Sequence, residues 1–171
     1  MWLRIAKKGA AATTVTHPEA LDAAICFGWI DAQRKSSDET YFLQRFCRRK
    51  PRSMWSKINR AKAESFVASG SMTPAGLREV HAAQADGRWD AAYDGQRTAS
   101  VPDDLAAAWE QRPKAREFFA TLDSRNRYAV LFRIQQAKKP ETRAKRVESF
   151  VAMLERHESV YPQLRRKERG C

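Results

Sequence analysis

Four prolines of this chain stand where an α-helix can begin, and their positions limit the fold more than any other feature of the sequence. Pro18 follows Thr16 and His17, Pro74 follows Thr73, and Pro113 and Pro140 each open a stretch that looks helical. Proline lacks an amide hydrogen, so the first turn of a helix accepts it while a helix interior does not. The sequence therefore predicts a series of short helices.

The ends of these helices are marked as clearly as their starts. Gly28 ends the helix that begins near Pro18, Gly70 ends one capped by Ser53 or Ser56, and Gly87 ends the one opened by Thr73 and Pro74. The chain beyond residue 102 is predicted to be wholly helical. Its expected helices run over residues 103–111, 113–122, 124–137 and 140–157.

A β-hairpin is predicted between the first two helices. The segments Trp29 to Lys35 and Thr40 to Arg48 are rich in strand-forming residues and flank the polar turn "SSDE". The opening "MWLRI" can be strand or coil. The predicted class is α+β, mainly α, with an N-terminal helix and hairpin packed on a C-terminal bundle of about five short helices. The expected parts are 1–60, a bundle over 61–160 in one compact domain, and a basic flexible tail over 161–171.

The net charge indicates the class of binding partner and says little about the fold. The 171 residues carry 32 Lys and Arg against 20 Asp and Glu, a formal charge of +12, and such an excess attracts polyanions. Cys26, Cys47 and Cys171 form no CxxC pattern, so neither a disulfide framework nor a metal site is expected. No segment has the apolar length of a signal peptide or a membrane span, and we expect a cytoplasmic protein without a cofactor.

No strong catalytic motif occurs, so no catalytic residue is assigned and binding is favoured over catalysis. Cys26 and His17 stand at opposite ends of one predicted helix, about 13 Å apart, which is too far for a nucleophile and its base. Cys26 is expected to be a buried, unreactive thiol.

Two basic clusters, the first within residues 45–62 and the second within residues 133–146, are the strongest chemical signal. If about six of their side chains contacted phosphates, affinity would fall steeply with salt, and Trp55 and Tyr41 could stack on unpaired bases. Trp55 also fits a core position, and arginines often pair with carboxylates. The candidate anion- or nucleic-acid-binding residues are Arg45, Arg48, Arg49, Arg52, Trp55, Lys57, Asn59, Arg60, Lys138, Lys139, Arg143 and Arg146.

Several blocks of sequence resemble the YdeI/OmpD-associated family, also labelled bacteriocin-protection proteins. These blocks are "CFGWIDAQRK", "RRKPRSMWSKINR", "MTPAG", "GRWDAAY" and "AKKPETRAKR", and the resemblance runs from about Trp2 to about Leu154. One departure is "RFCRRK", where the family more often has a Thr-Pro-Arg-like turn. The resemblance implies a small bacterial protein with a role in stress or in tolerance of antibacterial peptides.

Two roles are open for Asp31, which lies in the first of these blocks. Asp31 could pair with Arg52, Arg143 or Arg146 and tie the two halves of the chain together. Alternatively, the chain is a small enzyme with an anion-binding pocket around Asp31, Tyr93 and Arg143. The pocket candidates are Trp29, Asp31, Trp89 and Tyr93. A third function class, an adaptor for an acidic protein partner, fits the same charge.

Overall fold

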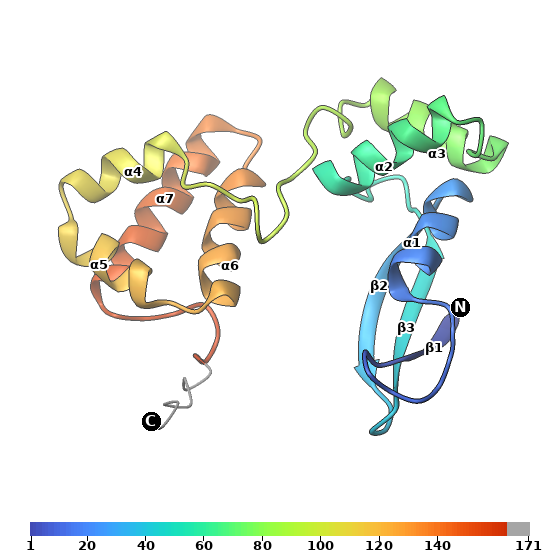
Figure 1. The fold of residues 1–171 in the computed structure, drawn as a ribbon. Coiled ribbons are helices and arrows are strands. Elements are labelled where there is room, and N and C mark those ends of the chain that lie inside the picture. The colour runs from blue at the N-terminus through green and yellow to red at the C-terminus, as the bar shows by residue number, and fades with distance from the viewer. Residues whose placement is uncertain (164–171) are drawn as a thin grey trace. The chain divides into compact units, whose positions relative to one another are not determined.

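The computed structural model describes residues 1–163, which form two compact units, one of residues 1–92 and one that begins at Tyr93 (Figure 1). In these residues the chain has seven helices and one three-stranded sheet, which confirms the α+β, mainly α class. The first unit holds all three strands with helices α1, α2 and α3. The helices expected after residue 60 are therefore shared between the two units.

The sheet has one strand more than the hairpin. Strands β2 (Trp29–Ser36) and β3 (Tyr41–Arg48) confirm the hairpin, and β1 (Trp2–Ala6) pairs antiparallel with the free side of β3. The strand order is β1-β3-β2. "MWLRI" is thus a strand, and β3 is hydrogen-bonded on both sides. Three strands that pack on a helix are far more stable than an isolated hairpin.

The two faces of the sheet differ in what they contact. Helix α1 (His17–Cys26) packs against the face that carries Phe42, Gln44 and Phe46, all buried. We call this the inner face of the sheet and the opposite one the outer face. Side chains of a strand alternate between faces, so the odd-numbered residues of β3 lie on the outer face. The register of β2 shifts between Asp31 and Arg34, as in a β-bulge.

A close contact joins the end of α1 to the start of α3 (Pro74–Ala85). The Thr73 amide and Oγ1 both donate to the Cys26 carbonyl oxygen, at 3.1 and 2.6 Å, and Thr73 caps α3 as predicted. A Cβ on Gly76 would lie 2.3 Å from the same oxygen and 2.3 Å from Met72 Sδ. Only glycine fits at this position without displacing one of the two helices.

The core of the first unit lies among α1, α2 (Lys57–Ala68) and α3. Ser56 caps α2, and its Oγ accepts from the Asn59 amide at 3.1 Å. The two tryptophans of this core, Trp55 and Trp89, meet edge to face at 4.9 Å between ring centroids. The buried cluster comprises Ile25, Trp55, Ala63, Met72, Val80, Ala83, Trp89 and Ala92.

The second unit is a helical bundle of α4 (Asp103–Glu110), α5 (Pro113–Thr121), α6 (Ser124–Gln135) and α7 (Pro140–Glu155). Each helix starts at its predicted residue and ends one or two residues early. Helix α7 packs against each of the other three helices. The buried cluster comprises Leu105, Trp109, Ala115, Phe119, Leu122, Val130, Leu131, Ile134, Val147, Val151 and Leu154.

A buried asparagine fixes the segment that follows α7. Asn126 is fully buried; its Nδ2 donates to the Tyr161 carbonyl at 3.2 Å, and its Oδ1 accepts from the Tyr161 amide at 2.8 Å. Residues 159–163 are therefore held against α6. The remainder of the expected tail, from residue 164 on, lies outside the described residues. Among the helices described, none combines the length and the apolar character needed to cross a membrane.

Candidate functional site

The outer face of the sheet brings two aromatic rings and three cations together. The strand register places Trp2 opposite Arg45, Arg4 opposite Leu43, and Lys35 on the other side of Leu43. The Arg4 guanidinium lies 4.0 Å from the centroid of the Tyr41 ring, and Lys35 Nζ lies 5.1 Å from that of Trp2. Trp2 is 41% exposed. Aromatic rings among cations are what unpaired bases and phosphates require.

The charges on this face are only partly neutralised. Arg4 pairs with Asp38 at 2.9 Å, and both side chains are largely exposed. Hydrogen bonds from the Tyr41 and Thr40 amides, together with Arg4, hold the pKa of Asp38 below its usual value, so this carboxylate stays ionised at neutral pH. Within residues 1–163, no carboxylate forms an ion pair with Lys35 or Arg45. Such cations remain available to an external anion.

The first basic cluster divides between surface and core. Arg45 lies on the outer face, whereas Arg48 lies on the inner side at the end of β3. Arg49 is 5% exposed, stacks over the Trp55 ring at 3.5 Å and donates to the Met54 carbonyl. Trp55 is 1% exposed and offers no ring face to a base. Of the two positions that the sequence allows for Trp55, base stacking and the core, the structure shows the core position.

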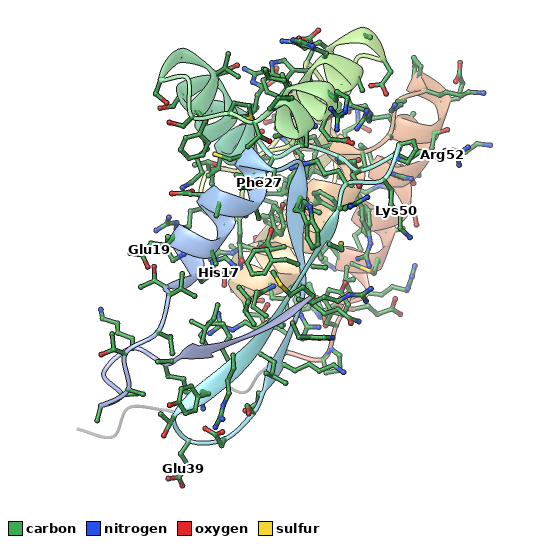
Figure 2. All side chains as sticks on the ribbon, turned by 90° about the vertical axis from the view of Figure 1, so that its right-hand side faces the viewer. His17, Glu19, Phe27, Glu39, Lys50 and Arg52 are labelled. Carbon is green, nitrogen blue, oxygen red and sulfur yellow. The ribbon has the colours of Figure 1, made fainter. Side chains whose placement is uncertain are left out.

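The other members of that cluster surround the start of α2. Arg52 lies exposed in the turn after β3, next to Lys50 (Figure 2), and Lys57 is exposed in the first turn of α2. Asn59 is buried, and its backbone amide donates to Ser56 Oγ. Arg60 donates to the Trp89 carbonyl at 3.2 Å and pairs with Glu64 at 3.5 Å. Asn59 and Arg60 therefore have structural contacts.

The second basic cluster lies in the second unit. Lys138 and Lys139 are exposed between α6 and α7. Arg143 makes a two-bond ion pair with Asp104, at 2.5 and 2.9 Å, and this pairing lowers the pKa of the Asp104 carboxyl. Arg146 donates to the carbonyl oxygen of Arg133. The two lysines are the more accessible anion contacts of this cluster.

The four pocket candidates are distributed over both units. Asp31 lies 3.4 Å from His17 Nε2, within the first unit. Its expected pairing with Arg52, Arg143 or Arg146 stays a prediction. Trp89 is buried against Trp55. Tyr93, in the second unit, packs edge to face on Phe132 at 5.1 Å.

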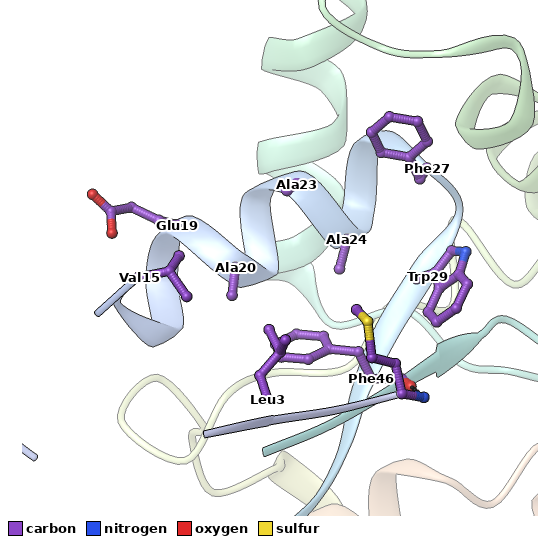
Figure 3. A pocket seen from close by; sticks show the side chains of 10 residues that line it. Leu3, Val15, Glu19, Ala20, Ala23, Ala24, Phe27, Trp29 and Phe46 are labelled. Carbon is purple, nitrogen blue, oxygen red and sulfur yellow. Dashed lines mark hydrogen bonds between the residues drawn. The ribbon is translucent and has the colours of Figure 1, made fainter. Parts of the chain in front are cut away.

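Trp29, the fourth candidate, lines an apolar pocket of about 390 Å³ between α1 and the inner face of the sheet. Ala20 and Ala24 of the helix face Leu3 and Phe46 across it, while the Glu19 carboxylate points away (Figure 3). Small alanine side chains leave this space open. The pocket could hold an apolar group, but it offers few polar atoms for orienting one.

Up to residue 163, the cysteines and carboxylates show no arrangement typical of a reactive centre. Burial, and next the negative charge of Asp22, raises the pKa of the Cys26 thiol, so this residue stays protonated at neutral pH. A protonated thiol is a weak nucleophile. In the described part of the chain, no three metal-ligating side chains come together.

Sequence reasoning missed part of the outer face. Tyr41 and Arg45 were named, but Trp2, Arg4 and Lys35 were not considered as ligand contacts. The signal was present in "MWLRI", where tryptophan and arginine alternate with apolar residues, the pattern of a half-exposed strand. This pattern indicates a shared binding face only once β1 is known to pair with β3, because the pairing brings Trp2 and Arg4 beside Tyr41 and Arg45.

Two family models match different parts of this chain. Residues 1–79 match a domain of unknown function, DUF8412. Residues 98–157, which contain all four helices of the second unit, match the family described as "Bacteriocin-protection, YdeI or OmpD-Associated". The resemblance found in the sequence is thereby confirmed for that region. Searches of curated proteins and of solved structures returned no match.

Proposed function

We propose that this protein contributes to bacteriocin protection or a related stress response by binding a polyanion, because residues 98–157 match the model of the bacteriocin-protection, YdeI or OmpD-associated family. The ligand proposed is single-stranded nucleic acid, bound on the outer face of the sheet in the first unit. The proposal also places the protein in the cytoplasm, where such ligands occur.

One observation carries the proposal, the array of Trp2, Arg4, Lys35, Tyr41 and Arg45 on one face. A base can stack on an exposed ring whatever its sequence, while neighbouring cations contact the phosphates. A duplex keeps its bases stacked inside, so it could use only the cations. Single strands should therefore bind more tightly than the duplex of the same sequence.

The number of cations sets the expected salt dependence. Arg4 is shared with Asp38, so two to three phosphates are neutralised. For single strands the slope of log affinity against log salt is about −0.7 per phosphate, which predicts a loss of about 7- to 18-fold between roughly 50 and 200 mM salt. A larger loss would require cations from outside this face.

Fluorescence anisotropy with a labelled 15-nucleotide single strand tests these expectations. Trp2→Leu removes the ring but keeps an apolar residue and should weaken binding by about 5-fold or more, the lower end of one lost stacking contact. Trp2→Phe should largely restore it. Arg45→Gln should reduce the salt slope by about 0.7, whereas Arg78→Gln, an exposed charge on α3, should leave the slope less affected.

Two results would count against the proposal. If Trp2→Leu binds as the parent does, stacking is not used. If polyglutamate competes as well as the oligonucleotide, the charge serves an acidic protein partner and the adaptor alternative is favoured.

A further inference from the structure

The second unit contains a pocket that the proposed function does not use. It has a volume of about 310 Å³ and is lined by Gln96, Arg125, Tyr128, Ala129, Phe132, Arg133 and Tyr161. We call it the tyrosine–arginine pocket. Helix α6 supplies its wall, and Asn126 fixes Tyr161 opposite through two hydrogen bonds. The pocket is therefore built from an ordered helix and a segment clamped to it.

Two arginines converge on one ring in this pocket. The Arg125 guanidinium lies 4.1 Å from the Tyr161 ring centroid and that of Arg133 lies 5.5 Å from it. Arg133 also donates to Tyr161 Oη at 3.3 Å. No carboxylate of residues 1–163 forms an ion pair with either arginine. Two like charges held at one ring repel, and an anion between them relieves that repulsion.

The remaining lining residues suit an aromatic group. Tyr128 and Phe132 lie one turn apart on α6, with ring centroids 5.5 Å apart. Burial raises the pKa of Tyr128 to about 12, and its hydroxyl donates to the Asp94 carbonyl at 3.0 Å. The ring is therefore neutral at physiological pH and adds no negative charge. Gln96 contributes an amide that both donates and accepts, as the edge of a heterocyclic base requires.

We infer that the tyrosine–arginine pocket binds a nucleoside monophosphate, with the phosphate between Arg125 and Arg133 and the base against Tyr128 and Phe132. The volume is at the lower end of small-molecule pockets, which suits one nucleotide and not a longer chain. The site shares no residue with the outer face of the sheet, so either site can exist without the other.

The test is a calorimetric titration of the full chain with each of the four common ribonucleoside monophosphates. At least one should bind 10-fold or more tightly than its own nucleoside and than ribose 5-phosphate, because both halves of the ligand are used. Equal binding of the nucleotide and either fragment, or no binding of any nucleotide, would overturn the inference.

Variants locate the site. Arg125→Gln changes an exposed side chain and should weaken the preferred nucleotide about 10-fold, with no change in the affinity for its nucleoside. Lys114→Gln removes one exposed charge from α5 of the same unit and should leave both affinities unchanged. Equal effects of the two variants would mean that only the overall charge attracts the nucleotide. The Trp2→Leu protein should bind the nucleotide as the parent does, which separates this inference from the oligonucleotide site.

Discussion

The contact between α1 and α3 predicts that Gly76→Ala destabilises the first unit, although alanine favours helices. In α3, replacing glycine by alanine would by itself stabilise the helix by about 1 kcal/mol. The structure opposes this gain, because the new Cβ would lie 2.3 Å from both the Cys26 carbonyl oxygen and Met72 Sδ. A backbone oxygen cannot move aside without moving its helix.

The size of the effect follows from what must shift. Overpacking costs about 1–3 kcal/mol. Moving the Cys26 carbonyl weakens its two hydrogen bonds from Thr73, at 3.1 and 2.6 Å, each worth about 0.5–1.5 kcal/mol. After the helix propensity of alanine is subtracted, the net loss is about 1–5 kcal/mol.

Urea unfolding followed by tryptophan fluorescence measures this loss, and amide hydrogen exchange in α3 assigns it to the first unit. The matched control is Ala82→Gly, an exposed position of the same helix, which should cost only about 0.5–1 kcal/mol of intrinsic propensity. A Gly76→Ala protein that is as stable as the parent, or more so, would show that the two helices are not in this contact.

Two further predictions concern the second unit. Asn126→Ala removes both bonds to Tyr161 and leaves the Tyr161 amide without its partner, while the Tyr161 carbonyl keeps its bond from Ser159 Oγ. The variant should lower the free energy of unfolding by about 2–4 kcal/mol and weaken the binding of the nucleotide expected beside Tyr161. Unchanged nucleotide affinity in this variant would contradict the role of Asn126 in holding Tyr161. Asp104 has its pKa lowered in the folded state, so its contribution is present above the unfolded pKa and lost as pH falls through the folded one. Asp104→Asn should make the free energy of unfolding depend less on pH between about pH 5 and 2. At pH 7 it should cost about 1 kcal/mol or less, because both partners are half-exposed. Urea midpoints at several pH values measure this dependence, and a dependence equal to that of the parent would contradict the pairing.

Local signals predicted most of the helices. Thr16 and Thr73 cap α1 and α3, and Pro113 and Pro140 begin α5 and α7 where expected. Capping depends on residues three or four apart, so the sequence displays it directly. The hairpin was predictable for the same reason, since its strands are joined by a short turn.

Contacts between distant residues were not predictable. β1 joins β3 across about 40 residues, and this pairing decides that Trp2 rather than Trp55 accompanies Tyr41. Trp55 has helical spacing to its neighbours and basic residues around it, which suits a core or a surface equally. Burial by Trp89 and the stacked Arg49 settles the question, and both depend on tertiary packing.

The extra residue in β2 decides on which face of the sheet Arg34 and Lys35 lie. Counted in steps of two from Asp31, Lys35 would lie beneath α1, opposite Phe42; the shifted register instead turns it outward, opposite Leu43. Deleting either Ala32 or Gln33 would restore a regular ladder in which Arg34 stays opposite Gln44 and Lys35 stays opposite Leu43. The bulge therefore lets Asp31 and Arg34 share the inner face, although a regular strand would turn residues three apart to opposite faces.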